Sequence, residues 1–145
     1  MTTIACDGKS MAGDTLCTAN GSVVAYHRKI ERLSDGRIVG SCGDATQCIL
    51  IRQWLEAGGD KPELDDDVEA IVLNLDGTID WWDKRFVPLR YIAPMAIGSG
   101  GDYAIGAMLA GQDPVGAVEI AMIRDRNTGG DVETYSLEPT LKAVA

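Results

Sequence analysis

The residues with the clearest chemical potential are the first three, Met1-Thr2-Thr3, which lead directly into the apolar stretch Ile4-Ala5-Cys6. Removal of the initiator methionine gives Thr2 a free α-amino group beside its own hydroxyl group. An α-amine has an ordinary pKa of about 7.7 to 8.0, so near neutral pH part of it is unprotonated and is able to take the hydroxyl proton. This is the N-terminal threonine form of nucleophile activation. Many chains begin with Met-Thr, so this start alone is more typical of an ordinary terminus.

The composition indicates one globular domain spanning residues 1–145. The 145 residues are 46% hydrophobic and carry a formal net charge of −9. No cluster of Lys and Arg is present to neutralise a phosphate backbone, which argues against a nucleic-acid partner. The apolar runs are short and interrupted by Pro, Asp or Gly, so we expect no membrane span and no signal peptide. A cytoplasmic protein is the expectation.

The cysteines do not form a metal-binding or redox pattern. Cys6, Cys17, Cys42 and Cys48 lack a Cys-x-x-Cys spacing, and the chain has a single histidine, His27. Structural zinc sites need closely spaced Cys and His ligands. We therefore expect four reduced and mostly buried thiols.

Turn signals divide the first part of the chain into strands. Asp7-Gly8 and Asp35-Gly36 each separate two short apolar runs, as in hairpins, and Asn20-Gly21 makes another turn before the run at 22–26. Beyond Asp44 the apolar residues adopt a helical spacing, with the aspartate as cap and Gly58-Gly59 as the end. The next segment, 60–67, has five acidic residues and a proline and predicts an exposed loop. The predicted strands are 3–6, 11–13, 22–26, 27–33 and 37–42.

The second part of the chain predicts a second sheet and two more helices. Residues 70–75 and 78–82 form a hairpin around Asp76-Gly77, and this hairpin is expected to begin the second sheet. Trp81 and Trp82 are adjacent, so one should face the core and the other the surface or an oligomer contact. The remaining predicted elements are an irregular stretch to residue 94, a strand at 95–97, helices at 102–109 and 115–123, a strand at 132–137 and a loose tail at 138–145.

Six short motifs are spread over nearly the whole chain. They are Thr2-Thr3-Ile4, Ala12-Gly13-Asp14, Arg28-Lys29-Ile30 with Leu33, Gly40-Ser41-Cys42-Gly43, Ala96-Ile97-Gly98-Ser99-Gly100-Gly101, and Arg124-Asp125 followed by Gly129-Gly130. In this order they resemble proteasome β-type subunits, and in particular bacterial HslV-type peptidases, of the N-terminal nucleophile (Ntn) hydrolase superfamily. The resemblance implies an α+β fold, a four-layer αββα sandwich of two antiparallel sheets. The family's second long helix is replaced here by the acidic loop, so one helical layer should be reduced.

The resemblance also implies catalytic roles. Thr2 corresponds to the nucleophile, Lys29 to the lysine beside it, and Asp14 to the carboxylate that stabilises that lysine's charge. Gly43 corresponds to the glycine whose N–H faces the developing oxyanion.

A further group would orient the threonine amine. Ser99 and Asp125 correspond to the residues that hydrogen-bond around this amine. Thr128 stands where the family usually has a serine, and it keeps the hydroxyl group. The chemistry implied by the resemblance requires no cofactor, and a structural monovalent or divalent cation near the Asp125 loop is left open.

The substrate would be an unfolded polypeptide or peptide bound as an added strand. Thr18 corresponds to the residue that pairs with the peptide through its backbone. The side-chain pocket would be lined by Cys17, His27, Glu31, Ser41 and Ala45. Because Glu31 is acidic, we expect a basic residue before the cleaved bond.

The function implied by the resemblance is a threonine endopeptidase within a ring-shaped homo-oligomer, with an AAA+ ATPase unfoldase as a further expected partner. The missing second helix leaves open whether two rings stack. Two alternatives remain at this point: a small-molecule amidase of the same superfamily, and a non-catalytic assembly subunit that retains Met1.

Overall fold

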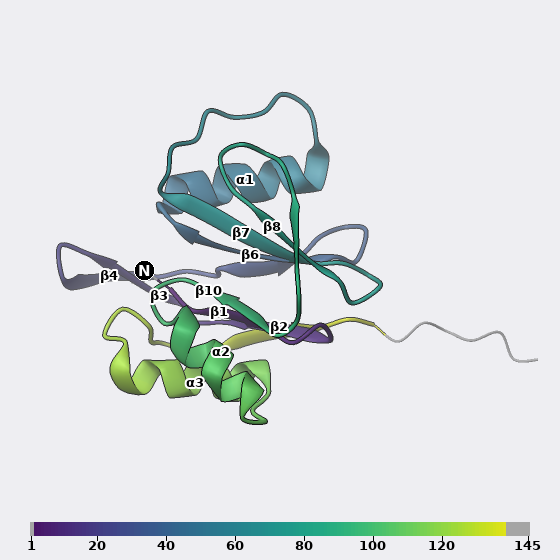
Figure 1. The fold of residues 1–145 in the computed structure, drawn as a ribbon. Helices are drawn as coiled ribbons and strands as arrows, with labels where there is room; N and C mark the ends of the chain where they lie inside the picture. The colour runs from purple at the N-terminus through teal and green to yellow at the C-terminus, as the bar shows by residue number, and fades with distance from the viewer. Residues whose placement is uncertain (1, 139–145) are drawn as a thin grey trace, which may run out of the picture.

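Residues 2–138 are described by the computed structural model, and they form four layers in the order helix, sheet, sheet, helices (Figure 1). One sheet has the strand order β10-β1-β2-β11, and the other has the order β5-β6-β7-β8-β9, with antiparallel neighbours in both. The strands of the first sheet are β1 (Ile4–Cys6), β2 (Ser10–Gly13), β10 (Met95–Ile97) and β11 (Glu133–Ser136). The strands of the second are β5 (Ile30–Arg32), β6 (Ile38–Gly43), β7 (Val68–Leu73), β8 (Ile79–Trp82) and β9 (Leu89–Tyr91).

Three helices and one hairpin complete the described part of the chain. Helix α1 (Ala45–Ala57) covers the five-stranded sheet, while α2 (Gly101–Leu109) and α3 (Pro114–Arg124) cover the four-stranded sheet (Figure 1). The hairpin of β3 (Leu16–Ala19) and β4 (Ser22–Tyr26) pairs with neither sheet. The predicted α+β sandwich of two antiparallel sheets is thus confirmed.

Some sequence-based predictions are wrong in detail. The second sheet does not begin at residue 70, because β7 pairs along the whole of β6 and continues the sheet that β5 and β6 start. The strand predicted at 27–33 is limited to Ile30–Arg32. Strands β3 and β9 were not predicted, and β9 lies in the proline-containing stretch.

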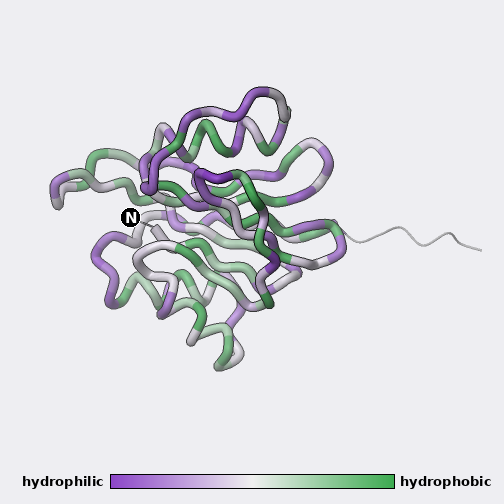
Figure 2. Tube along the Cα trace, turned by 45° about the horizontal axis from the view of Figure 1, so that its top comes forward, coloured by the Kyte–Doolittle hydropathy of each residue, from purple (hydrophilic) through white to green (hydrophobic). Residues whose placement is uncertain are grey.

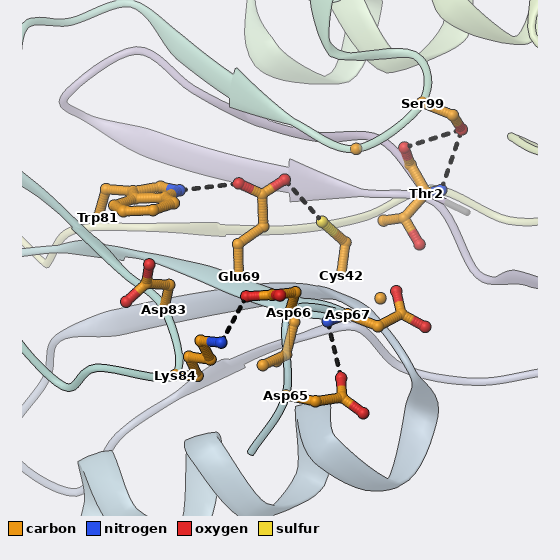
Figure 3. A pocket seen from close by; sticks show the side chains of 13 residues that line it. Thr2, Cys42, Asp65, Asp66, Asp67, Glu69, Trp81, Asp83, Lys84 and Ser99 are labelled. Atoms are coloured by element: carbon orange, nitrogen blue, oxygen red, sulfur yellow. Dashed lines mark hydrogen bonds and ion pairs between the residues drawn. The ribbon is translucent and has the colours of Figure 1, made fainter.

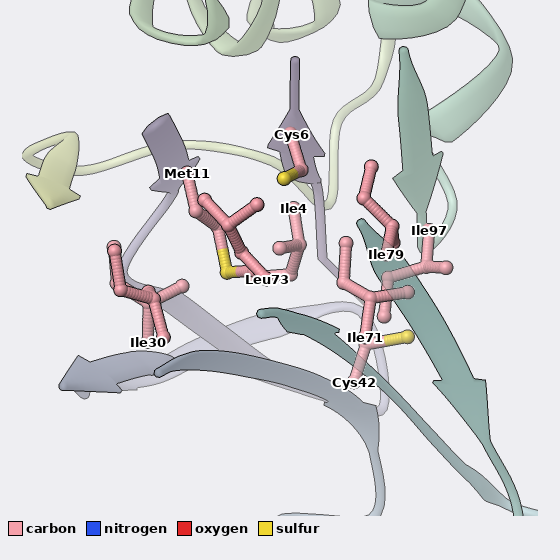
Figure 4. Close-up of a cluster of buried hydrophobic side chains, with 10 residues drawn as sticks. Ile4, Cys6, Met11, Ile30, Cys42, Ile71, Leu73, Ile79 and Ile97 are labelled. Carbon is pink, nitrogen blue, oxygen red and sulfur yellow. The ribbon is translucent and has the colours of Figure 1, made fainter. Parts of the chain in front are cut away.

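Side-chain alternation along the strands separates three hydrophobic layers. Ile4 lies in the cluster between the two sheets, whereas Ala5 lies against α2 and α3. Likewise Ile71 lies between the sheets and Val72 lies under α1. Successive residues of a strand face opposite sides, so one short strand serves two layers. Figure 4 shows the central cluster, and Figure 2 shows hydrophobic stretches along the strands and helices.

The layer above the five-stranded sheet contains one helix. The side chain of Asp44 accepts a hydrogen bond from the N–H of Gln47 and caps α1, as predicted. Cys48, Ile51 and Leu55 bury one face of α1 against the sheet. The acidic segment 60–67 contains neither helix nor strand, so this layer is reduced compared with the paired helices on the other side.

The helices of the described chain are short. The longest, α1, has 13 residues, and none has the length and apolar character needed to cross a bilayer. Of the predicted tail at 138–145, residues 139–145 lie outside the described residues, as does Met1.

Candidate active site

Thr2 lies just before β1 and contacts the turn between β10 and α2. Its side chain is nearly buried, with the residue 4% exposed. The backbone N–H of Thr2 donates to Ser99 Oγ at 3.2 Å, and its carbonyl accepts from the N–H of Gly100 at 3.3 Å. The structure therefore brings residues 97 positions apart in the sequence into direct contact around the candidate nucleophile.

Glycines in the β10–α2 turn permit this close approach. Gly98 has φ of +96°, and a Cβ at this position would lie 1.9 Å from the carbonyl oxygen of Thr2. A Cβ on Gly100 would lie 2.0 Å from Thr3 Oγ1. Any side chain at either position would push the turn away from Thr2. The glycine-rich motif is thus required by the contact that it makes.

Asp125, the residue that ends α3, connects Ser99 to the interior. Its Oδ2 accepts from Ser99 Oγ at 2.5 Å and from Thr128 Oγ1 at 2.6 Å, and its Oδ1 accepts from the N–H of Asn127 at 3.0 Å. Burial alone raises the pKa of Asp125, but these hydrogen bonds outweigh burial and hold the pKa below its ordinary value. Asp125 therefore stays ionised at neutral pH and fixes the orientation of Ser99.

Asp14 and Lys29 form a second buried polar group beside Thr2. Asp14 is fully buried, and its Oδ1 accepts from Lys29 Nζ and from the N–H of Thr3, each at 3.0 Å. Its Oδ2 accepts from the N–H of Gly129 at 3.0 Å. Lys29 Nζ also donates to the carbonyl of Leu16 at 2.6 Å. A buried carboxylate with three donors, one of them the cation of Lys29, is well compensated, so its charge and position are stable.

Gly43 closes the site at the end of β6. It has φ of +116°, and a Cβ there would lie 2.2 Å from the carbonyl oxygen of Asp67. The neighbouring N–H of Asp44 donates to the same carbonyl at 2.8 Å. Only glycine fits this backbone conformation and this contact. The predicted close approach of a substrate carbonyl to Gly43 also requires a residue without a side chain.

Two cavities meet at Thr2, and both are lined by Thr2, Cys42, Gly43 and Asp67. The hairpin-side cavity, about 610 Å³, extends between the β3–β4 hairpin and the first turns of α1. The loop-side cavity, about 510 Å³, extends from residues 65–67 to β8 and is shown in Figure 3. A reacting group at Thr2 would therefore have space on two sides.

The predicted substrate-binding residues gather on one of these cavities. Five of them line the hairpin-side cavity: Cys17, Thr18, His27, Ser41 and Ala45. Glu31 is not among its lining residues, and its carboxylate lies 3.6 Å from Arg52 Nε. All seven predicted catalytic residues belong to the two buried polar groups or line the cavities. Their catalytic roles remain predictions.

The structure adds residues that the sequence analysis did not identify. Thr3 Oγ1 lies 2.7 Å from Thr128 Oγ1 and links the two buried polar groups. Arg52, on α1, lines the hairpin-side cavity, and its Nη1 donates to Ser41 Oγ at 2.5 Å. The repeated Thr-Thr was a signal for Thr3, whereas nothing in the local sequence distinguishes Arg52 from a surface arginine.

Glu69 organises the wall of the loop-side cavity. It accepts from Trp81 Nε1 at 2.8 Å and from Cys42 Sγ at 3.4 Å (Figure 3). Two causes raise the pKa of the Cys42 thiol: burial, which is the larger, and the nearby Glu69 carboxylate. Cys42 is therefore a neutral hydrogen-bond donor next to Thr2 rather than a reactive thiolate.

All four cysteines are free, and Cys6, Cys42 and Cys48 are buried. Among residues 2–138, no group of three or more His, Cys, Asp or Glu side chains is arranged to hold a metal ion. The question of a structural cation beside the Asp125 loop stays open.

Comparison with known proteins identifies the fold. No family model and no curated protein matches this sequence. The solved structure of Thiobacillus denitrificans BPH matches with a TM-score of 0.70 and 22% identity over 95% of this chain and 98% of that chain. BPH in complex with epoxomicin matches with the same TM-score and identity, over 95% and 99%. Eukaryotic HslV from Trypanosoma brucei matches with a TM-score of 0.68 and 22% identity, over 93% and 99%. The chain thus has the fold of BPH and HslV, and the resemblance found in the six motifs is confirmed at the level of the fold.

Proposed function

We propose that this chain is a threonine-type peptidase of the Ntn-hydrolase superfamily, with Thr2 as the nucleophile after removal of Met1. The observation that carries the proposal is the 3.2 Å contact from Thr2 N to Ser99 Oγ. Ser99 Oγ in turn donates a hydrogen bond to Asp125, which fixes its position. This arrangement fits an amine that is oriented as a base for the hydroxyl group of its own residue. Fold similarity alone would not indicate this chemistry, because one fold hosts many functions.

The first half of the proposed reaction forms an ester. Thr2 Oγ attacks the carbonyl carbon of the peptide, and the hydroxyl proton passes to the α-amine. The oxyanion that forms accepts a hydrogen bond from the N–H of Gly43, and one such donor is worth roughly 3 kcal/mol in a transition state. The C–N bond then breaks, and the departing amine takes the proton from the α-ammonium group. The positive charge of Lys29 favours the negative charge that develops at Thr2 Oγ.

The second half releases the product. A water molecule attacks the ester carbonyl and gives its proton to the α-amine of Thr2. Collapse of this second tetrahedral species breaks the ester bond, and Thr2 Oγ recovers the proton. The enzyme returns to its starting state, and both halves use the same base.

Assembly into a cytoplasmic ring, with an AAA+ ATPase as partner, belongs to the same proposal. The assembly part of the proposal is supported by three exposed side chains on the projecting β3–β4 hairpin: Val23, Val24 and Tyr26 are 58%, 60% and 63% exposed. Grouped exposed apolar side chains mark interaction surfaces more often than free surface. Light scattering should give a mass several times that of one chain.

Peptide hydrolysis tests the catalytic proposal. The wild-type protein should cleave fluorogenic peptides, and Thr2→Ala should lose activity by about 10⁴-fold or more, as nucleophile removal does elsewhere. Thr2→Ser should retain measurable activity, because it keeps both hydroxyl and amine. Cleavage of small amides but no peptide would favour the amidase alternative, and no cleavage of either with Met1 retained would favour an assembly subunit.

A further inference from the structure

The two cavities beside Thr2 differ in charge. The loop-side cavity is lined by five carboxylate residues, Asp65, Asp66, Asp67, Glu69 and Asp83, against one cation, Lys84. The hairpin-side cavity has three permanent cations, Arg28, Lys29 and Arg52, against Asp44 and Asp67. A charged substrate side chain would therefore meet opposite fields on the two sides of the nucleophile.

Arg52 is the cation best placed to meet a substrate in the hairpin-side cavity. Lys29 is paired with buried Asp14, and Arg28, whose side chain is 62% exposed, is paired with Glu133. The side chain of Arg52 is 15% exposed, and Ser41 Oγ holds one end of its guanidinium. The Glu31 carboxylate is 3.6 Å from Nε, beyond hydrogen-bond distance. Among the described residues, these contacts use only part of the five N–H donors of the guanidinium.

Neither carboxylate that lines the hairpin-side cavity, Asp44 or Asp67, forms an ion pair with Arg52. The side chain of Asp44 is engaged as the helix cap and accepts from the N–H of Gln47 at 3.1 Å. Asp67 lies where the two cavities meet, beside Gly43. On the wall formed by Arg52 and Ser41, the guanidinium therefore has a fixed position, and its remaining N–H groups can donate to a ligand.

We propose that the hairpin-side cavity selects an acidic side chain, glutamate or aspartate, on the residue before the cleaved bond, with Arg52 as its partner. This inference rests on the proposed peptidase function. The predicted peptide-pairing residue Thr18 lines this cavity and not the loop-side cavity, so the segment before the bond lies here. A carboxylate meets the planar guanidinium in a charge-assisted hydrogen bond, whereas the loop-side carboxylates repel it.

This proposal reverses the preference expected from the sequence. Glu31 was expected to favour a basic residue, but the structure places it beside Arg52 rather than on the cavity. There it supports the position of the guanidinium. A basic substrate side chain would meet Arg52 itself, which costs binding energy.

A matched peptide series tests the proposal on the wild-type protein. Four fluorogenic peptides differ only in the residue before the cleaved bond: Glu, Gln, Leu or Lys. Glu should exceed its neutral isostere Gln in kcat/KM by about tenfold, since a charge-assisted hydrogen bond contributes on the order of 1.4 kcal/mol. A peptide with Lys or Leu as the preferred residue would overturn the proposal.

Two arginine variants assign the effect to Arg52. Arg52→Gln should lower kcat/KM for the Glu peptide by about tenfold and change the Leu peptide by less than about twofold. Arg37→Gln is the control, because Arg37 is also a partly buried arginine that contacts α1, through the carbonyl of Leu55, but lines neither cavity. An equal loss for all four peptides in Arg52→Gln would contradict a selective role.

The proposed function and this inference fail in different ways. If no peptide is cleaved and an epoxyketone peptide does not modify Thr2, the peptidase proposal falls, and this inference falls with it. If Thr2 is modified and peptides are cleaved without a preference for Glu over Gln, only the inference is overturned. Should Arg52→Gln not fold, as judged by circular dichroism, Arg52→Lys keeps the charge and should retain part of the preference for Glu, and its complete loss would count against a charge-based role.

Discussion

The polar network behind Thr2 and the cavities in front of it differ in burial and in how firmly their charges are held. Asp14 is fully buried, and its carboxylate accepts hydrogen bonds from protein donors only. Lys29 and Asp125 are at most 9% exposed. On the cavity side, by contrast, the side chain of Asp66 is 91% exposed, although it pairs with Lys84. The comparison teaches that the charges behind Thr2 are held in place by buried partners, whereas the charge of Asp66 on the loop side faces solvent and contributes little.

Among variants that leave Thr2 itself in place, the largest effect is expected for Lys29→Ala, which leaves the buried carboxylate of Asp14 without its cation. Breaking a buried pair in this way costs about 3–5 kcal/mol, and activity should fall by roughly 10³-fold or more because the charge at Thr2 is lost. Urea denaturation and peptide hydrolysis measure the two losses. Arg28→Ala is the stability control, since its pair with Glu133 is exposed and should cost under about 1 kcal/mol.

A double variant sharpens this result. Asp14→Asn combined with Lys29→Met removes both charges and should recover much of the lost stability without recovering activity. Recovery of both would mean that the pair acts only through folding, which is contrary to the account.

The next largest effect is expected for Gly98→Ala, whose methyl group would lie against the carbonyl of Thr2. The displacement of Ser99 should lower kcat/KM by about 100-fold, as a 1 Å misplacement does in other sites. Gly58→Ala is a close control: Gly58 also has a positive φ, +68°, but a Cβ there meets nothing within 4 Å. The control should lose about 1 kcal/mol of stability and keep its activity.

A smaller, pH-dependent effect is expected for Asp125→Asn. The pKa of Asp125 is lowered in the folded state, so the ionised form stabilises the fold above the ordinary aspartate pKa of about 3.9, and this contribution is lost as the pH falls through the lowered value. The difference in unfolding free energy between wild type and variant should therefore shrink below about pH 4. A difference that stays constant from pH 6 to pH 3 would argue against the carboxylate network.

The smallest effect is expected on the open side of the comparison. Asp66→Asn removes one exposed charge and its pair with Lys84. The melting temperature should change by less than about 2 °C and peptide hydrolysis by less than about twofold. A loss as large as that of Gly98→Ala would show that the loop-side cavity is as constrained as the network.

The sequence predicted the network better than it predicted the cavities. Each motif alone has other uses, but the order of all six predicted which residues belong together. The structure brings five of these residues together around the first strand: Thr2, Asp14, Lys29, Ser99 and Asp125. Turn signals likewise predicted antiparallel neighbours, such as β1 with β2 and β5 with β6.

The remaining features depend on contacts that the local sequence does not encode. Turn signals predict that two strands are antiparallel neighbours, but they do not say which sheet the next strand joins, so the partner of β7 was missed. Glu31 and Arg52 are 21 positions apart, and only the packing of α1 on the sheet decides which of them lines the cavity. For this reason the expectation of a basic residue, which was based on Glu31, did not take Arg52 into account.

The most direct test of the central claim is mass spectrometry of the protein after treatment with a peptide epoxyketone. The account predicts that Met1 is absent and that one inhibitor is attached at Thr2, with no attachment in Thr2→Ala. Retention of Met1 in the native protein, or attachment at any other residue, would contradict it.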